Sequence, residues 1–316
     1  MFDKMIFNVM IPSEAEAITI AEHNRLEKWV SETSTQYQST ELAKFSGVYI
    51  SINSGKMKIK CSLHKYYSKL FYGRLENDGM FTVSDSLRAL ETLFENIGVD
   101  KERAKITYFE IGLNIPTDHE PIQYIELVRN LSMGIATKTE KILFIDARYH
   151  INRQKTTEKR KTIKKVFKIY DKGFEKADRK RTTPTDEKIL RIETMYRRQS
   201  VKVKDFFTPS NLDRITRTFF RDWESLEFSR TVIATKGIKE SQIRNAESLL
   251  QLGREQFLND TKSELDKGNI TATQYRTIRE FVRDWDTNKH KYKLPPTEHE
   301  REFKTKFKQL FRVAKN

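Results

Sequence analysis

The sequence predicts an α+β protein in which an antiparallel sheet packs on helices through one face and an all-helical region follows. Segments in the first two thirds, such as residues 105–115 (KITYFEIGLNI), alternate apolar and polar residues as half-buried strands do. Amphipathic helical segments such as residues 84–97 lie between them. From Asp205 onward the spacing becomes helical, so we place the domain boundary near Lys204 and expect domains 1–204 and 205–316.

The individual elements follow from periodicity and from turn residues. Ser13 is a helix cap, Asn53-Ser54-Gly55 is a hairpin turn, and Gly98 ends a helix. In order, the first region is predicted to contain strand 5–11, helix 13–30, hairpin 48–67, helix 84–97, strand 105–115, helix 121–131 and strands 141–145, 162–172 and 189–197. The second is predicted to contain helices 210–227, 239–252, 254–267, 271–286 and 297–314.

Composition narrows the class of partner. The 316 residues carry a formal net charge of +15, which favours a polyanion such as nucleic acid or a membrane surface. No apolar run is long enough for a transmembrane helix and no secretory signal is recognisable, so we expect a protein that does not enter membranes. The single cysteine, Cys61, excludes an internal disulfide and a multi-cysteine zinc site, and its apolar neighbours predict a packed thiol.

Four predicted strands each have an apolar face and a face with reactive side chains. Because side chains alternate across a strand, one sheet would place these polar faces together. The gathered residues would be His64, Glu110, Tyr170, Lys172 and Glu193, with Lys58, Lys60 and Lys168 nearby. Carboxylates and an imidazole beside a tyrosine are suited to Mg²⁺ or Mn²⁺. The simpler interpretation is that these residues are the wet face, salt bridges and half-buried tyrosine of an ordinary sheet.

A strongly basic stretch spans residues 153–181, with 13 Lys or Arg against 4 Asp or Glu. Its exposed lysines could follow a DNA backbone, or they could belong to a solvated loop. The predicted DNA-binding lysines, here and in the hairpin, are Lys58, Lys60, Lys65, Lys161, Lys164, Lys165 and Lys168.

Blocks of sequence in this order resemble the replication initiators of the filamentous-phage gene II type. The blocks are KCSLHKYY, FTVSDSLRALETLFENIGVDKERAKITYFEIGLNI, FKIYDKGFE and LRIETMY, and the resemblance covers roughly residues 45 to 230. It implies a core like that of the histidine–hydrophobe–histidine endonucleases, site-specific nicking of one strand at an origin, a covalent phosphotyrosine, and a free 3′-OH for the host polymerase.

The resemblance also implies roles for individual residues. Tyr170 in the IYDKxxE block would be the nucleophile, with Lys172 beside it, and Glu110 would be the favoured metal ligand. His64 could hold the metal with Glu110, and Glu193 could help as a ligand or as a base. None of the six histidines lies two residues from another, so a two-histidine metal site on one strand is excluded.

The predicted function is therefore a metal-dependent initiator of rolling-circle replication that acts on origin DNA in a bacterial cytoplasm, with host helicase and polymerase as further partners. The alternatives are a non-catalytic origin-binding protein and a mobilisation relaxase, which shares the chemistry at a transfer origin. The C-terminal helices would bind duplex DNA, support the first domain or mediate association.

Overall fold

The computed structural model of the chain describes residues 1–32, 34–39, 47–77, 79–131, 140–145, 152–154, 165–180, 187–233 and 235–314. They form two compact units. Unit 1 comprises Met1–Ile122, Ile135–Arg221 and Lys306–Asn316, and unit 2 comprises Gln123–Gly134 and Asp222–Thr305. This division differs from the predicted boundary near Lys204, because Phe220 packs on Phe307 and Phe311 and so ties residues on both sides of unit 2 into unit 1.

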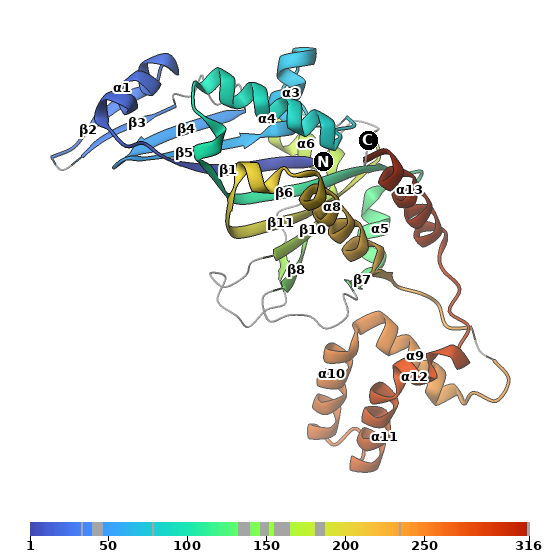
Figure 1. Cartoon of the computed structure of the whole chain (residues 1–316). Helices are drawn as coiled ribbons and strands as arrows, with labels where there is room; N and C mark the ends of the chain where they lie inside the picture. Colours follow the sequence, from blue (N-terminus) through green and yellow to red (C-terminus); the bar gives the residue numbers. More distant parts are fainter. Residues whose placement is uncertain are drawn as a thin grey trace. The chain divides into compact units, whose positions relative to one another are not determined.

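Unit 1 is built on one large sheet, which confirms the α+β prediction (Figure 1). The strand order is β2-β3-β4-β5-β1-β6-β11-β10-β8-β9, and neighbouring strands are antiparallel except for β8 and β10. The strands are β1 (Phe2–Met10), β2 (Glu27–Val30), β3 (Thr35–Gln38), β4 (Val48–Asn53), β5 (Lys56–Ser62), β6 (Ala104–Pro116), β8 (Glu140–Ile145), β9 (Asn152–Gln154), β10 (Lys165–Asp171) and β11 (Ile189–Lys202).

Helices α1 (Glu14–His23), α3 (Leu63–Tyr72) and α4 (Val83–Ile97) lie along one face of this sheet (Figure 1). Phe94 of α4 packs edge-on against Phe7 of β1, with ring centroids 5.3 Å apart. Helix α4 begins with a capping box between Thr82 and Asp85 and ends at Gly98, whose φ of 73° a glycine adopts without strain.

The remaining elements of unit 1 are short or flank the strands that carry the candidate site. A 3-10 turn η1 (Lys101–Arg103) precedes β6, α6 (Lys172–Lys180) follows β10, and α7 (Val203–Phe206) follows β11. Phe206 packs against Phe2 and Phe109, with centroids 5.6 Å and 4.8 Å away. Helices α5 (Pro121–Leu127), α8 (Pro209–Glu224) and α13 (Glu298–Ala314) each contain residues of both units.

Unit 2 is mainly helical, as expected for the C-terminal region, with one small antiparallel pair, β7 (Val128–Leu131) and β12 (Leu226–Phe228). Its helices are α9 (Glu240–Leu252), α10 (Arg254–Asp266), α11 (Ala272–Arg283) and α12 (Trp285–Asn288), followed by the 3-10 turn η3 (Lys289–Lys291). Their apolar faces share a core with Ala246, Leu249, Phe257, Trp285 and Tyr292.

Three predicted elements change type along their length. The predicted helix 13–30 ends at His23, and the chain continues as β2. The predicted helix 121–131 becomes β7 after Leu127. The second strand of the predicted hairpin ends at Ser62, whose side chain accepts a hydrogen bond from the Lys65 amide and caps α3.

The prediction that Cys61 is a packed thiol agrees with the structure. Cys61 is buried between the sheet and its helices, and burial raises the pKa of its thiol. Within the described part of the chain, no helix combines the length and apolar character needed to cross a membrane.

Candidate active site

Three adjacent strands place the predicted polar residues on one sheet face. In the β10–β11 pair, Tyr170 lies opposite Arg191 and Lys168 lies opposite Glu193. In the β11–β6 pair, Glu193 lies opposite Gly112, and Glu110 is two residues before Gly112 on the same face of β6. The structure therefore brings Glu110, Lys168, Tyr170 and Glu193 together, as strand alternation predicted.

The Glu193 carboxylate is the centre of this cluster. The Tyr170 hydroxyl donates to its Oε1 at 2.8 Å, and Arg191 Nε donates to the same oxygen at 2.6 Å. Lys168 Nζ lies 2.6 Å from Oε2 and 3.8 Å from Glu110 Oε1. Glu110 also accepts a hydrogen bond from the Tyr108 hydroxyl. Both oxygens of Glu193 thus face cations, and Oε1 also accepts the hydrogen bond from Tyr170, the candidate nucleophile.

Arg191 connects this centre to strand β1. Its guanidinium donates to Asp3 and, at 2.7 Å, to Asn114 Oδ1. Asp3 in turn accepts hydrogen bonds from Ser62 and from Asn77. Arg191 is only 2% exposed, so a buried charge network rather than an open wet face occupies this side of the sheet.

The sequence reasoning missed part of this network. Arg191 has no role in the predicted site, although its place two residues from Glu193, on the same face of a strand, was the available signal. Asp3 belongs to a strand that was not among the four considered, and only the three-dimensional pairing shows that it meets Arg191.

Lys172 does not lie on the strand face where it was predicted. It is the first residue of α6, it is 4% exposed, and its Nζ lies 2.8 Å from Glu175 Oε2 within the same helix. Burial and the Arg191 charge lower its pKa, while Glu175 opposes that shift. The strand prediction was wrong because Asp171 accepts a hydrogen bond from the Phe174 amide, which starts a helix.

His64 is also outside the predicted strand face. It lies in the first turn of α3, and its ring stacks on Phe81 with centroids 4.5 Å apart. It lines a cavity of about 120 Å³ whose wall also includes Asp3 and Arg191. His64 is therefore connected to the cluster through this cavity instead of through the sheet.

Opposing electrostatic effects set the charges in the cluster. Burial alone would raise the pKa of Glu193, but Lys168 and Arg191 lower it well below the usual range. Burial raises the pKa of Glu110, and Lys168 only partly offsets this. Burial and the Glu193 charge raise the pKa of Tyr170 well above 10. In this state Tyr170 is a neutral phenol that donates its proton toward an ionised carboxylate.

The predicted metal ligands do not form a metal site as they are arranged. Among the described residues, no group of three His, Cys, Asp or Glu side chains could hold a metal ion. Lys168 lies between Glu110 and Glu193, where a divalent cation bridging the two carboxylates would have to lie. The side-chain arrangement thus fits an ammonium ion better than Mg²⁺ or Mn²⁺.

The predicted DNA-binding lysines fall into four groups, the last of which is the pair Lys58 and Lys60 on β5. Lys165 and Lys168 were expected to be exposed, but neither is. Lys165 is 8% exposed and packs over the Phe167 and Tyr196 rings, and Lys168 belongs to the cluster. Lys65 is half-buried on α3. Lys161 and Lys164 lie outside the described residues.

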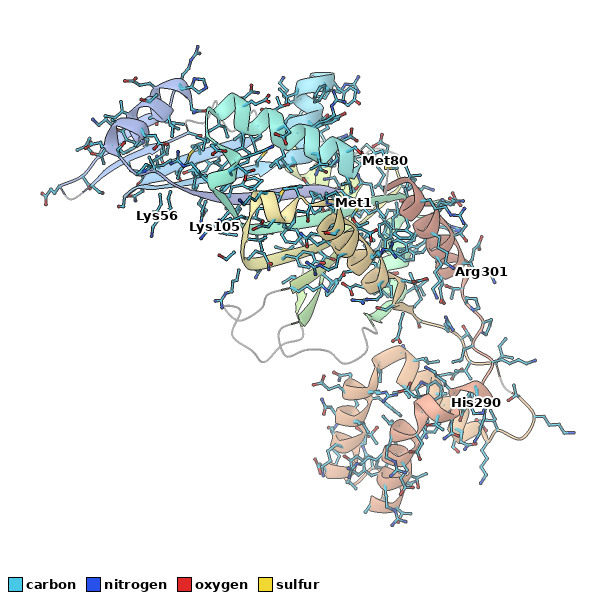
Figure 2. All side chains as sticks on the ribbon, viewed as in Figure 1. Met1, Lys56, Met80, Lys105, His290 and Arg301 are labelled. Carbon is cyan, nitrogen blue, oxygen red and sulfur yellow. The ribbon has the colours of Figure 1, made fainter. Side chains whose placement is uncertain are left out.

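Lys58 and Lys60 belong to a lysine-rich sheet face, which we define by Lys4, Lys56, Lys58, Lys60 and Lys105. Lys58 and Lys105 both pair with Asn8, from β5 and β6, and Lys56 pairs with Met10. Figure 2 shows Lys56 and Lys105 near the same end of the sheet. Lys60 lies 4.9 Å from the Tyr49 ring centroid and Lys4 lies 5.8 Å from that of Tyr108, so cations and aromatic rings alternate on this face.

The charge of the chain is divided unevenly between the units. Unit 2 contains 16 Lys or Arg and 16 Asp or Glu, so the excess of +15 belongs entirely to unit 1. Unit 2, which contains α9, α10, α11 and α12, therefore brings no net positive charge to the predicted duplex-binding role, whereas unit 1 has the charge that a polyanion would require.

Comparison with known proteins leaves the family open. Neither a scan against protein-family models nor a search of curated proteins found a match. The buried cluster and the basic surface of unit 1 are therefore the features that bear on function.

Proposed function

We propose that the chain nicks one strand of origin DNA through Tyr170 and later reseals it, as an initiator of rolling-circle replication does. The observation that carries the proposal is the hydrogen bond from the Tyr170 hydroxyl to Glu193, inside a cluster that also holds Arg191 and Lys168. A tyrosine oriented by a carboxylate and flanked by cations has the parts of an activated nucleophile.

The chemistry is a phosphodiester exchange. Tyr170 Oη forms a bond to phosphorus, the bond from phosphorus to the 3′-oxygen breaks, and the phenol proton passes to Glu193. The 3′-oxygen leaves and takes up a proton from water. One ester replaces another, so a free 3′-OH can reverse the step and reseal the strand without another energy source.

Glu193 is needed because the phenol is a poor nucleophile. With an ordinary pKa of about 10, roughly 0.1% of a tyrosine is ionised at pH 7, and the raised pKa of Tyr170 reduces that fraction further. Glu193 can accept the proton from 2.8 Å as the new bond forms, once phosphate oxygens take Lys168 and Arg191 away from it and its pKa rises. Arg191 and Lys168 would then place two positive charges beside the phosphate oxygens, where negative charge develops.

Access is the main requirement that the geometry imposes. Tyr170 is 7% exposed, so a phosphate group reaches its hydroxyl only if the cluster opens. The donors of Arg191 and Lys168 now serve carboxylates, and a phosphate would compete for them. Binding of DNA would thus have to exchange internal ion pairs for phosphate contacts.

The experiment uses single-stranded DNA of random sequence with a label at its 3′ end. Because the tyrosine joins the 5′ phosphate of the downstream fragment, the label should stay on the protein in denaturing gels. Tyr170→Phe should abolish the adduct, and Glu193→Gln should lower its rate by about 10²–10⁴-fold, the usual contribution of a general base. Reactions with Mg²⁺, with Mn²⁺ and with EDTA test the expected metal requirement.

A matched control is Tyr37→Phe, which removes a hydroxyl from another buried tyrosine of the same sheet, 6% exposed on β3. It should leave adduct yield unchanged. An adduct that survives Tyr170→Phe would exclude Tyr170 as the nucleophile.

A second candidate is a non-catalytic DNA-binding protein. The saturation of Arg191 and Glu193 by internal partners favours it, because such a network also fits a purely structural role. Tight binding to supercoiled origin DNA with no nicked product and no adduct would support this candidate over the first.

A further inference from the structure

The end of α3 exposes large apolar and aromatic side chains. Leu70 is 42% exposed, Phe71 43% and Tyr72 67%, and Met80 in the following loop is 51% exposed. Exposed large apolar side chains that lie together mark interaction surfaces more often than single ones do. Gly73 ends the helix with a φ of 69°, which turns the chain back so that the loop containing Met80 lies beside it.

A pocket of about 190 Å³ lies at this place, and we call it the α3 pocket. It is lined by His64, Tyr67, Tyr72 and Met80, and by the polar residues Ser68, Arg74 and Glu76. Aromatic walls with a few hydrogen-bonding groups are the features that hold an extruded nucleobase in enzymes that act on single strands.

A row of rings leads inward from the exposed end of α3. Phe71 and Tyr67 have centroids 4.5 Å apart, Tyr67 and Phe81 5.6 Å, and Phe81 and His64 4.5 Å, with the last two rings nearly parallel. His64 and Met80 line both the α3 pocket and the cavity that reaches Arg191. The α3 pocket and the cavity that reaches Arg191 therefore share a wall.

Several cations lie near these rings. The Arg88 guanidinium lies 4.6 Å from the Phe71 centroid, Lys69 of α3 is exposed, and Arg74 is exposed in the pocket lining. The one carboxylate among the described lining residues, that of Glu76, lies 3.8 Å from Lys176 Nζ. Aromatic faces for bases combined with cations for the backbone characterise single-stranded nucleic acid sites. An apolar protein partner would not need this charge, and a duplex would hide its base faces.

We propose that the α3 pocket binds an unpaired base of single-stranded DNA, with Tyr72 as its stacking platform. The inference rests on the proposed function for its substrate class alone, because base binding does not require that Tyr170 cuts the strand. The pocket would hold the strand beside the cluster while its backbone lies near Arg74.

The test measures binding of the full chain to a fluorescein-labelled 20-nucleotide single strand by anisotropy. Tyr72→Ala should raise Kd about 5- to 150-fold, the range for loss of one stacked base. Tyr72→Phe should bind as wild type, and Tyr72→Leu should bind as weakly as Tyr72→Ala, because only a ring stacks. Duplex binding should not change in any of these variants.

Two further readouts distinguish the loss of base stacking from a general loss of affinity. A 2-aminopurine within the strand should be quenched by the wild-type chain and by Tyr72→Phe, but less by Tyr72→Ala. The salt dependence of Kd should be unchanged in Tyr72→Ala, while Arg74→Ala should reduce the slope of log K against log salt by about 0.7. Ile18→Ala, an exposed apolar residue of α1, controls for loss of apolar surface elsewhere.

Unchanged single-strand affinity in Tyr72→Ala, or equal losses in Tyr72→Phe and Tyr72→Ala, would overturn the base pocket. If that happens while the Tyr170 adduct forms, nicking stands without this pocket. If instead Tyr72→Ala weakens binding and the wild-type chain forms no adduct, the pocket stands and nicking fails.

Discussion

Gly112 is the position where a single methyl group tests the architecture of the buried cluster most sharply. A Cβ at Gly112 would lie 2.5 Å from Arg191 Nη2 and 3.3 Å from Glu193 Cγ. The guanidinium has little freedom to move away, because it is buried and bonded to Asp3, Asn114 and Glu193. Gly112→Ala should therefore displace Arg191 from at least one of these partners.

The expected cost has two parts. Forcing a methyl group into a packed site costs about 1–3 kcal/mol, and loss of a charge-assisted hydrogen bond costs about 1.5–3 kcal/mol. Because the two partly overlap, we expect a loss of about 2–4 kcal/mol in the free energy of unfolding. For a unit of this size that corresponds to roughly 4–16 °C in Tm.

Thermal unfolding followed by circular dichroism measures this effect. The matched control is Gly79→Ala, since a Cβ at Gly79 meets nothing within 4 Å. Gly79→Ala should unfold within about 2 °C of the wild-type chain. If Gly112→Ala unfolds at the same temperature as Gly79→Ala, Arg191 is not held against β6 as described, and the reasoning about the cluster is wrong.

Three further predictions follow from named ion pairs. In unit 2, Arg230→Met should cost about 2 kcal/mol in urea unfolding, because it removes a charged hydrogen-bond donor 2.8 Å from Glu300, which is 1% exposed but keeps Lys304 at 2.7 Å. The exposed Arg217→Met should cost less than about 0.5 kcal/mol. Burial would raise the pKa of Asp3, but Arg191 lowers it to about 2, so the stability that Asp3 adds should be present above pH 4 and lost between pH 4 and pH 2. A gap in Tm between wild type and Asp3→Asn that stays constant over this range would contradict that assignment. Lys168→Met should raise Mn²⁺ affinity in titration calorimetry by vacating the position between two carboxylates, and equal affinity in both chains would show that a metal binds elsewhere.

Strand alternation was enough to predict the central part of the cluster. Residues 105–115 and 189–197 form β6 and β11, and their polar faces meet Tyr170 and Lys168 of β10 as expected. The period of two determines which residues share a face, and that information is local to each strand.

The errors arise where a local hydrogen bond competes with the strand pattern. Ser62 and Asp171 each turn an alternating segment into a helix through a side-chain cap, which moved His64 and Lys172 away from the sheet. Alternation of apolar and polar residues over three or four positions does not distinguish a strand from a first helical turn.

The burial of the cluster could not be predicted from the sequence. A polar strand face usually indicates solvent, but Arg191 and Asp3 come from strands far apart in the chain, and Arg191 neutralises both Asp3 and Glu193 inside the structure. Only the pairing of β1, β6 and β11 shows that these charges meet.

The central claim, that Tyr170 is a nucleophile activated by Glu193, is tested most directly by mapping the adduct. The wild-type chain is incubated with single-stranded DNA, digested with protease and nuclease, and searched by mass spectrometry for a peptide that carries a nucleotide. We expect the modified residue to be Tyr170, and we expect Glu193→Gln to lower its modification at least 100-fold. A nucleotide on any other residue, or full modification of Tyr170 in Glu193→Gln, would contradict it.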